Sequence, residues 1–341
     1  MAERGFGRRL GWLVGIVFIL ALLWLGYWYA ANMFAERTIA RFNGVPHNGQ
    51  TVECTEPALS GFPLRLDFRC SKGTYSGPLE RVTAALGGVA ASAPLYWPGS
   101  VEATLDSPLV LNAPAHGIAL SMTWSEGTAT GSAGLNGLRS VGAAFTALSA
   151  NNTGTVPGLP VKSLAADAAS ASISPAGGGA YTILASTRGM KLTRTDDSAL
   201  PNIDADIGVT ALNVGSGLGT DPVRSLIEWL RAGSSIRIDR LRIAAGGAIL
   251  GANGTLSISN EGVLSGSVVL RFTNLDAFTA LAGQIKPGSG EHASQAMAAI
   301  TALSVPVDTE DGPARQTTVS ITDGLVWVGI IPVGAAPRIK L

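Results

Sequence analysis

Residues 236–272 have the sequence IRIDRLRIAAGGAILGANGTLSISNEGVLSGSVVLRF, which contains three apolar runs. Within each run, apolar residues recur at every second position, the period of a half-buried β-strand. Gly-Gly at 246–247 and Asn-Glu-Gly at 260–262 separate the runs, and short connections of this kind join antiparallel strands. The stretch therefore predicts an antiparallel meander over 236–243, 248–258 and 264–272, with a bulge at 239–240 where the alternation changes phase.

Similar short runs, bounded by Gly, Pro or Asn, occur along most of the chain. Further strands are expected at 61–68, 88–93, 101–106, 108–112, 118–124, 163–173, 316–322 and 324–331. Helices are expected at 138–150, 221–233, 275–281 and 291–303. These elements predict an α+β fold that is mainly β: a large curved antiparallel meander sheet with a few packed helices.

The composition agrees with a β-rich body and limits the partners. The 341 residues include 43 Gly and 18 Pro, and charged residues make up only 14%. Such a chain is too apolar for disorder and too rich in turn residues for a helical bundle. Acidic and basic side chains balance at 24 each, so charge gives no reason to expect nucleic acid as a partner.

The apolar stretch 10–31, LGWLVGIVFILALLWLGYWYAA, is long enough to cross a bilayer. A cleaved signal peptide is the competing interpretation, but its apolar region is usually shorter and ends in small residues, whereas this stretch ends in aromatic residues typical of a membrane interface. Arg4, Arg8 and Arg9 precede it, while Glu36 and Arg37 follow it and cancel. The positive-inside rule then leaves the N-terminus in the cytoplasm.

The expected organisation is a cytoplasmic segment 1–9, a transmembrane helix 10–31, a stalk 32–48 and a periplasmic body 49–341. The stalk continues the helix to about Arg41 and ends at the breaker Asn-Gly-Val-Pro of 43–46. The turn-rich stretch 151–160 marks a candidate subdivision of the body near residue 155. The predicted location is therefore the inner membrane, with a single pass.

Cys54 and Cys70 are the only cysteines. In an oxidising compartment such a pair forms a disulfide, and one closing a loop of about 15 residues stabilises the fold by roughly 3 kcal/mol. A metal site would need further ligands, and His47 is the only histidine nearby. A structural disulfide is the favoured interpretation.

Three motifs of Gly, Pro and apolar residues carry a resemblance to a known family: GFPLRL at 61–66, APLYWP at 93–98 and DGLVWVGIIPVG at 323–334. With the preceding membrane span, they resemble the DUF2125 family of α-proteobacterial envelope proteins over essentially the whole chain. The resemblance implies a fold and supplies no catalytic residues. More loosely, the chain resembles AsmA-like envelope proteins, which implies a long curved sheet with an apolar face for lipid acyl chains.

Residues for catalysis, cofactors or metals are not evident. His47, His116 and His292 lie far apart among small or turn residues, and no nucleophile elbow, metalloprotease motif or phosphate-binding loop occurs. Asp204 and Asp206 alternate with apolar neighbours, which places them on the solvated face of a strand. We therefore expect a protein that is not an enzyme, with no catalytic, cofactor-binding or metal-binding residues.

The tryptophans of the body pack in a core or line an apolar groove, and sequence alone does not separate these roles. The residues expected at such a groove are Trp97, Trp124, Leu264, Val268, Leu270 and Phe272. The favoured function is a membrane-anchored protein that binds lipid on an apolar sheet surface in the cell envelope. A scaffold that binds other envelope proteins is the alternative, and an envelope hydrolase a remote one.

Overall fold

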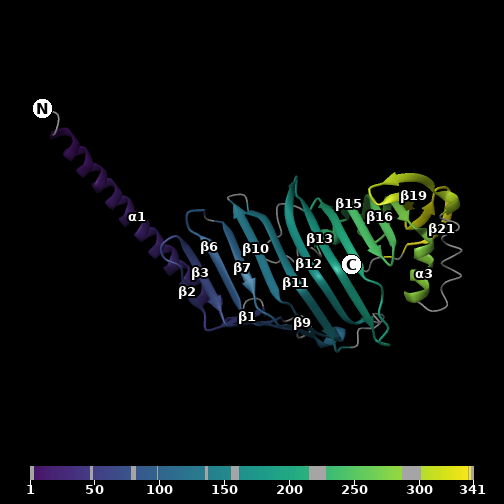
Figure 1. Cartoon of the computed structure of the whole chain (residues 1–341), viewed down its shortest axis with the longest axis horizontal. Coiled ribbons are helices and arrows are strands. Elements are labelled where there is room, and N and C mark those ends of the chain that lie inside the picture. The colour runs from purple at the N-terminus through teal and green to yellow at the C-terminus, as the bar shows by residue number, and fades with distance from the viewer. Residues whose placement is uncertain are drawn as a thin grey trace.

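The computed structural model describes residues 4–46, 49–77, 82–97, 99–134, 137–154, 161–214, 228–285, 301–336 and 338. A long N-terminal helix, α1 (Arg4–Phe42), leads into an open sheet, and the strands follow one another along this sheet in chain order (Figure 1). Helix α1 ends where the Asn-Gly-Val-Pro breaker begins, as predicted. The fold class is confirmed: one large, unclosed antiparallel sheet with few helices.

The N-terminal part of the sheet is folded into two layers. The upper layer contains β2 (Ala58–Ser60), β3 (Arg65–Cys70), β6 (Val89–Pro94), β7 (Ser100–Leu105) and β10 (Glu126–Gly134). The lower layer contains β1 (Thr51–Thr55), β4 (Lys72–Ser76), β5 (Thr83–Leu86), β8 (Leu109–Ala113) and β9 (Ile118–Thr123). A 3-10 turn, η1 (Pro114–His116), connects β8 to β9.

Consecutive strands in this part are the two halves of one bent strand. In the upper layer β2 pairs with β3, β3 with β6, β6 with β7 and β7 with β10. In the lower layer β1 pairs with β4, β4 with β5, β5 with β8 and β8 with β9. Only one to three residues separate most of the halves, for example Ser71 between β3 and β4. The meander is therefore simple and sequential, and each of its first strands bends at a line that we call the corner.

The two layers join at β11 (Gly137–Asn152). Its first half pairs with β10 of the upper layer, and its last residues pair with β9 of the lower layer. Ala147, with a positive φ of 50°, lies between the two pairing segments. The far edge of β11 pairs with β12 (Val161–Gly177), so the sheet continues across the turn-rich stretch 151–160, of which residues 155–160 lie outside the described part.

Beyond β12 the sheet is a single layer of long strands. It continues through β13 (Ala180–Arg194), β14 (Ile203–Leu212), β15 (Ser234–Ala245), β16 (Ala248–Ile258), β17 (Leu264–Thr273) and β19 (Gly312–Thr322). On its other edge β19 pairs with β18 (Val305–Thr309) and then β20 (Leu325–Val328), which pairs with β21 (Ile331–Ala335). Helix α3 (Leu275–Ile285) follows β17.

The meander predicted from 236–272 is confirmed, including its bulge. The register between β15 and β16 shifts between Ile238 and Leu241, so that Asp239 and Arg240 together lie opposite the single residue Asn253. The turn at Gly246 and Gly247 has φ values of 56° and 82°, which glycine adopts without strain. Helix 275–281 is also confirmed, as the first part of α3.

Two predicted elements are wrong, and the strand expected at 61–68 begins only at Arg65, because 61–64 form the loop between β2 and β3. The expected helix 138–150 is part of β11: its Leu and Ala residues favour a helix, but pairing on both edges overrides this propensity. The expected single strand 324–331 is broken by a turn at Gly329, with φ 61°, into β20 and β21. Most of the expected helices 221–233 and 291–303 lies outside the described residues, and only 228–231 and 301–303 are seen as helical.

Candidate functional site

The strand register aligns residues into rows that cross the sheet, because directly paired residues point to the same face. One row, which we call the alanine row, crosses from β2 to β17. It consists of Leu59, Phe68, Ala91, Ala103, Ala129, Ala143, Ala171, Ala185, Ile207, Leu241, Ala252 and Leu270. Each of these residues is apolar. At about 4.8 Å between strands, the alanine row is roughly 50 Å long.

From β11 onward, two further rows flank the alanine row on the same face. On one side lies the valine row: Val141, Ile173, Ile183, Val209, Ile238, Gly254, Val268, Val319 and Val328. On the other side lies the phenylalanine row: Phe145, Ala169, Thr187, Ala205, Ile243, Leu250 and Phe272. Apart from Thr187, every residue of the three rows is apolar or glycine, so together they make one broad apolar face of the sheet.

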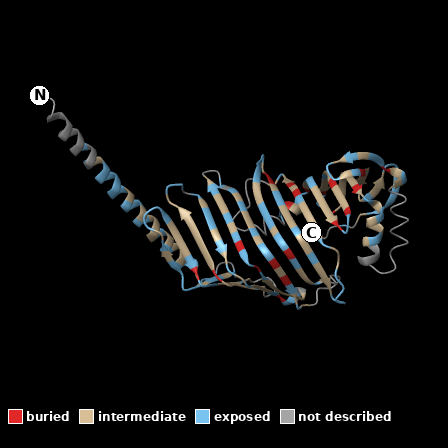
Figure 2. Cartoon of the chain, viewed as in Figure 1, coloured by how far each residue is buried: buried red, intermediate tan, exposed pale blue. Residues whose placement is uncertain are grey.

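The middle of this apolar face is open. Ala171, Val141, Ile183 and Ile207 are exposed, which is unusual for apolar residues that lie side by side on a sheet. Figure 2 shows the same strands coloured mostly as intermediate or exposed. Contiguous exposed apolar residues mark a candidate interaction surface.

Both ends of this apolar face are partly covered. At the corner, Trp124 is buried with Leu148 and Ala166, and side chains of both layers pack against this cluster, including Leu105 above and Met122 below. The Trp124 Nε1 donates to the Leu105 carbonyl at 2.7 Å. The apolar side of the sheet thus faces inward where the sheet folds.

At the other end, α3 packs on the apolar face. The Phe272 and Phe278 rings meet edge to face, with centroids 5.5 Å apart, and Phe272 is buried. Trp229 is also buried, and its Nε1 donates to the Leu212 carbonyl at 2.8 Å. Within the described residues, the apolar face is therefore most exposed over the central strands, while the alanine row is half-buried in the folded half at Leu59 and Phe68.

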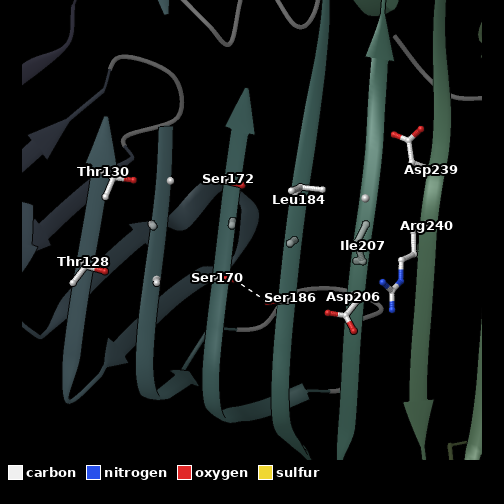
Figure 3. A pocket seen from close by; sticks show the side chains of 16 residues that line it. Thr128, Thr130, Ser170, Ser172, Leu184, Ser186, Asp206, Ile207, Asp239 and Arg240 are labelled. Carbon is white, nitrogen blue, oxygen red and sulfur yellow. Dashed lines mark hydrogen bonds between the residues drawn. The ribbon is translucent and has the colours of Figure 1, made fainter. Parts of the chain in front are cut away.

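The opposite face of the same strands is polar. A hollow of about 550 Å³ lies there, lined by Ser and Thr, by charged side chains such as Asp206 and Arg240, and by the apolar Leu184 (Figure 3). Ser170 and Ser186 are hydrogen-bonded across β12 and β13 at 2.8 Å, and Arg188 forms an ion pair with Asp206 at 2.9 Å. As predicted, Asp206 lies on a polar strand face, and these groups bond to one another across the strands.

Charged groups continue along this polar face to the hairpin of β18 and β19. Arg242 holds Asp311 through two nitrogens, with Nη2 to Oδ1 at 2.7 Å and Nε to Oδ2 at 3.0 Å. The hydrogen bonds from Arg242 lower the pKa of Asp311. A hydrogen bond from Thr210, and then one from Arg237, lower the pKa of Asp239. Both carboxylates are thus stabilised in their ionised form.

The predicted groove residues lie in three separate places. Trp124 is in the corner core, Trp97 is exposed near α1, and the four β17 residues lie on the apolar face of the far half. Of these four, Val268 and Leu270 belong to the valine and alanine rows, whereas Phe272 is covered by α3. The alanine row itself was missed, because small residues give little signal until the register aligns them.

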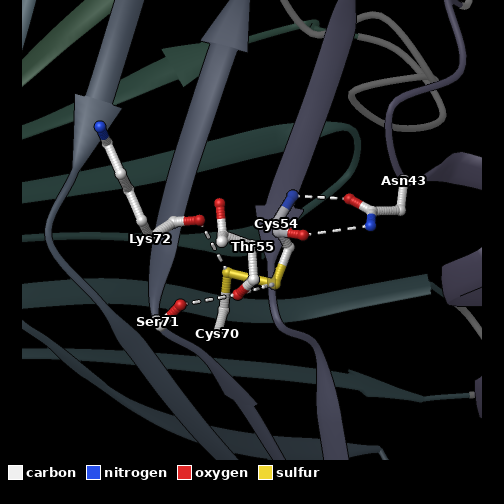
Figure 4. The surroundings of a disulfide bond; sticks show 6 residues. All are labelled: Asn43, Cys54, Thr55, Cys70, Ser71 and Lys72. Carbon is white, nitrogen blue, oxygen red and sulfur yellow. Dashed lines mark hydrogen bonds between the residues drawn. A yellow bond between two sulfur atoms is a disulfide. The ribbon is translucent and has the colours of Figure 1, made fainter.

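Cys54 and Cys70 form the predicted disulfide, which links β1 to the end of β3 at the corner (Figure 4). Asn43, the first residue after α1, binds the Cys54 backbone twice: its Nδ2 donates to the carbonyl at 3.1 Å, and its Oδ1 accepts from the N–H at 2.6 Å. The disulfide and Asn43 therefore connect the end of α1 to both layers of the sheet.

The described residues contain no cluster of three or more His, Cys, Asp or Glu side chains that could hold a metal ion. His47 and His292 lie outside the described part, and of His116 only the backbone is placed. Asp196 and Asp197 lie in the turn after β13, where Asp197 forms an ion pair with Lys162 at 2.6 Å.

Comparison with known protein families gives one match. A family model described as an uncharacterized protein conserved in bacteria, DUF2125, matches residues 28–337. The chain belongs to the DUF2125 family. The DUF2125 match includes the whole alanine row and both cysteines. No curated protein and no solved structure matches the chain.

Proposed function

We propose that this DUF2125 protein is anchored in the inner membrane by α1 and binds lipid acyl chains along the alanine row on the periplasmic side. The unbroken apolar row across the sheet is the observation that carries the proposal. Burying one methylene group in an apolar site contributes about 0.8 kcal/mol, so a chain lying along several strands would bind without any polar contact.

The anchor rests on α1. Residues 15–42 form a helix long and apolar enough to cross a membrane, with a mean hydropathy of 1.7, and none of its apolar window is buried against the sheet. The disulfide supports an oxidising compartment for the sheet, and the arginines before the apolar stretch favour a cytoplasmic N-terminus.

The test is photo-crosslinking in cells with benzoylphenylalanine at Ile183 or, as a matched control, at Leu184. These neighbours on β13 are both large, apolar and exposed, at 37% and 52%, but Ile183 lies on the apolar face and Leu184 on the polar face. We expect lipid adducts, detected by mass spectrometry of the crosslinked peptide, at position 183 and not at 184.

Protein adducts at position 183 would instead support the alternative, a scaffold for other envelope proteins. Equal lipid labelling at both positions would contradict a specific lipid site. The pair of probes therefore separates the two functions without removing any residue of the core.

A further inference from the structure

A group of large exposed side chains lies at the end of the sheet next to α1. Phe62 and Leu64 belong to the loop between β2 and β3, and Tyr96 and Trp97 follow β6. Their exposed fractions are 57%, 55%, 67% and 64%. Since β3 pairs with β6, the two loops are neighbours, and Phe62, Leu64 and Tyr96 line one hollow of about 540 Å³. We call these four residues the aromatic tip.

The loops of the aromatic tip are bonded to α1. Trp24 Nε1 donates to the Pro63 carbonyl at 2.9 Å, and the Tyr27 hydroxyl donates to the Leu95 carbonyl at 3.4 Å. The Trp28 ring meets Phe62 edge to face, with centroids 5.1 Å apart. The loops thus lie beside the helix within its apolar stretch, before the stalk begins.

This position fixes the depth of the aromatic tip. Trp24, Tyr27 and Trp28 belong to the last part of the apolar stretch, 24–31, which is about 12 Å of helix. If α1 spans the bilayer, this part lies at the outer headgroup and acyl boundary, where Trp and Tyr are enriched. A loop held against it lies at the same depth, and its apolar side chains are buried by insertion of about 5–10 Å.

We propose that the aromatic tip inserts into the periplasmic leaflet beside α1, so that the sheet begins within the bilayer surface. Leu59 and Phe68, the first residues of the alanine row, lie on β2 and β3, the strands that the Phe62 loop connects. Lipid acyl chains then reach the row from the leaflet without crossing water. This inference rests on the membrane anchor of the proposed function but not on lipid binding by the row.

The experiment uses the full chain in vesicles of phosphatidylethanolamine and phosphatidylglycerol that contain brominated lipid. An environment-sensitive fluorescent amino acid replaces Trp97, Leu25 or Ile330 in three separate proteins. Leu25 lies in the apolar stretch of α1. Ile330 is 90% exposed in the turn between β20 and β21, the last two strands of the chain. We expect bromine quenching at positions 97 and 25 but not at 330.

Quenching at position 25 alone would overturn insertion of the aromatic tip while leaving the anchor intact. Absence of quenching at all three positions would overturn the anchor and with it the proposed function. Quenching at all three would indicate that the whole sheet adsorbs to the vesicle, which also contradicts a specific tip.

A second variant tests whether the neighbouring side chains of the aromatic tip hold position 97 in the leaflet. Phe62→Asp should remove the quenching at position 97 and leave the quenching at 25 unchanged. Leu325→Asp, also at an exposed apolar position but in the last strands, is the matched control and should change neither. Unchanged quenching at 97 in Phe62→Asp would count against the tip.

Discussion

The two halves of the sheet share the same alternation of apolar and polar residues, but its apolar face is used differently in each half. Up to β11 the strands bend at the corner, and the apolar face closes on itself around Trp124, Leu148 and Ala166. Beyond β11 the sheet is a single layer, and the middle of the same face remains exposed at Ile183 and Ile207. Folding a sheet on itself thus makes a core, whereas leaving it open makes a binding surface from the same pattern.

The sharpest test of this difference uses one strand and one substitution. Ala166 and Ala171 both lie on β12, but Ala166 is buried in the corner and Ala171 is exposed in the open part. Ala166→Asp buries an unpaired carboxylate and should lower the free energy of unfolding by about 3–5 kcal/mol. Ala171→Asp should change it by less than about 0.5 kcal/mol. Thermal unfolding of the detergent-solubilised chain measures both, and equal losses would contradict the comparison.

Loss of the disulfide should give the next largest decrease in the free energy of unfolding, and we expect this decrease to be confined to the folded half. Cys54→Ser removes a link that closes a loop of sequence separation 16, and we expect a loss of roughly 3 kcal/mol. Limited proteolysis should then cut near the corner more rapidly, while the cleavage rate beyond β14 stays the same. Reduction of the wild-type protein should reproduce the pattern, and identical proteolysis of oxidised and reduced protein would show that the link does not stabilise the corner.

The smallest expected change in the free energy of unfolding is for an ion pair in the open half. Asp311→Asn breaks the paired hydrogen bonds from Arg242. Both side chains are partly exposed, at 26% and 31%, so the change should lower the free energy of unfolding by about 1 kcal/mol at pH 7. Because the pKa of Asp311 is lower in the folded than in the unfolded chain, its contribution is complete above the unfolded pKa of about 4 and disappears as the pH falls through the lowered folded value.

Thermal unfolding at pH 7 and at pH 3 measures this contribution. The difference in melting temperature between the wild type and Asp311→Asn should shrink at the lower pH. A difference that persists unchanged would indicate that the variant acts by another route than the loss of a charged partner.

Alternation and turn chemistry were sufficient to predict most of the strands but not how they assemble. The run 236–272 gave its strands, turns and bulge because each signal is local to a few residues. The corner could not be predicted, since Ser71 or Trp124 marks a bend only once the paired strands are known. Residues 138–150 were misassigned as a helix for the same reason: the evidence against a helix lies in β10 and β12.

The candidate site shows the same limit more strongly. Val268 and Leu270 were predicted for the apolar surface because large apolar residues give a clear period. Ala103, Ala129 and Ala171 are unremarkable singly, and only the register places them in one line. A surface made by small side chains is therefore visible in the pairing and hidden in the sequence.

The sequential order of the meander also means that the number of strands sets the length of the alanine row. Since each strand pairs mainly with its neighbours in the chain, inserting or deleting one hairpin would lengthen or shorten the alanine row by about 10 Å without rearranging the remaining strands. The distance that the row covers outward from α1 is then set by strand number alone, and so it can change in steps while the composition of each strand stays the same.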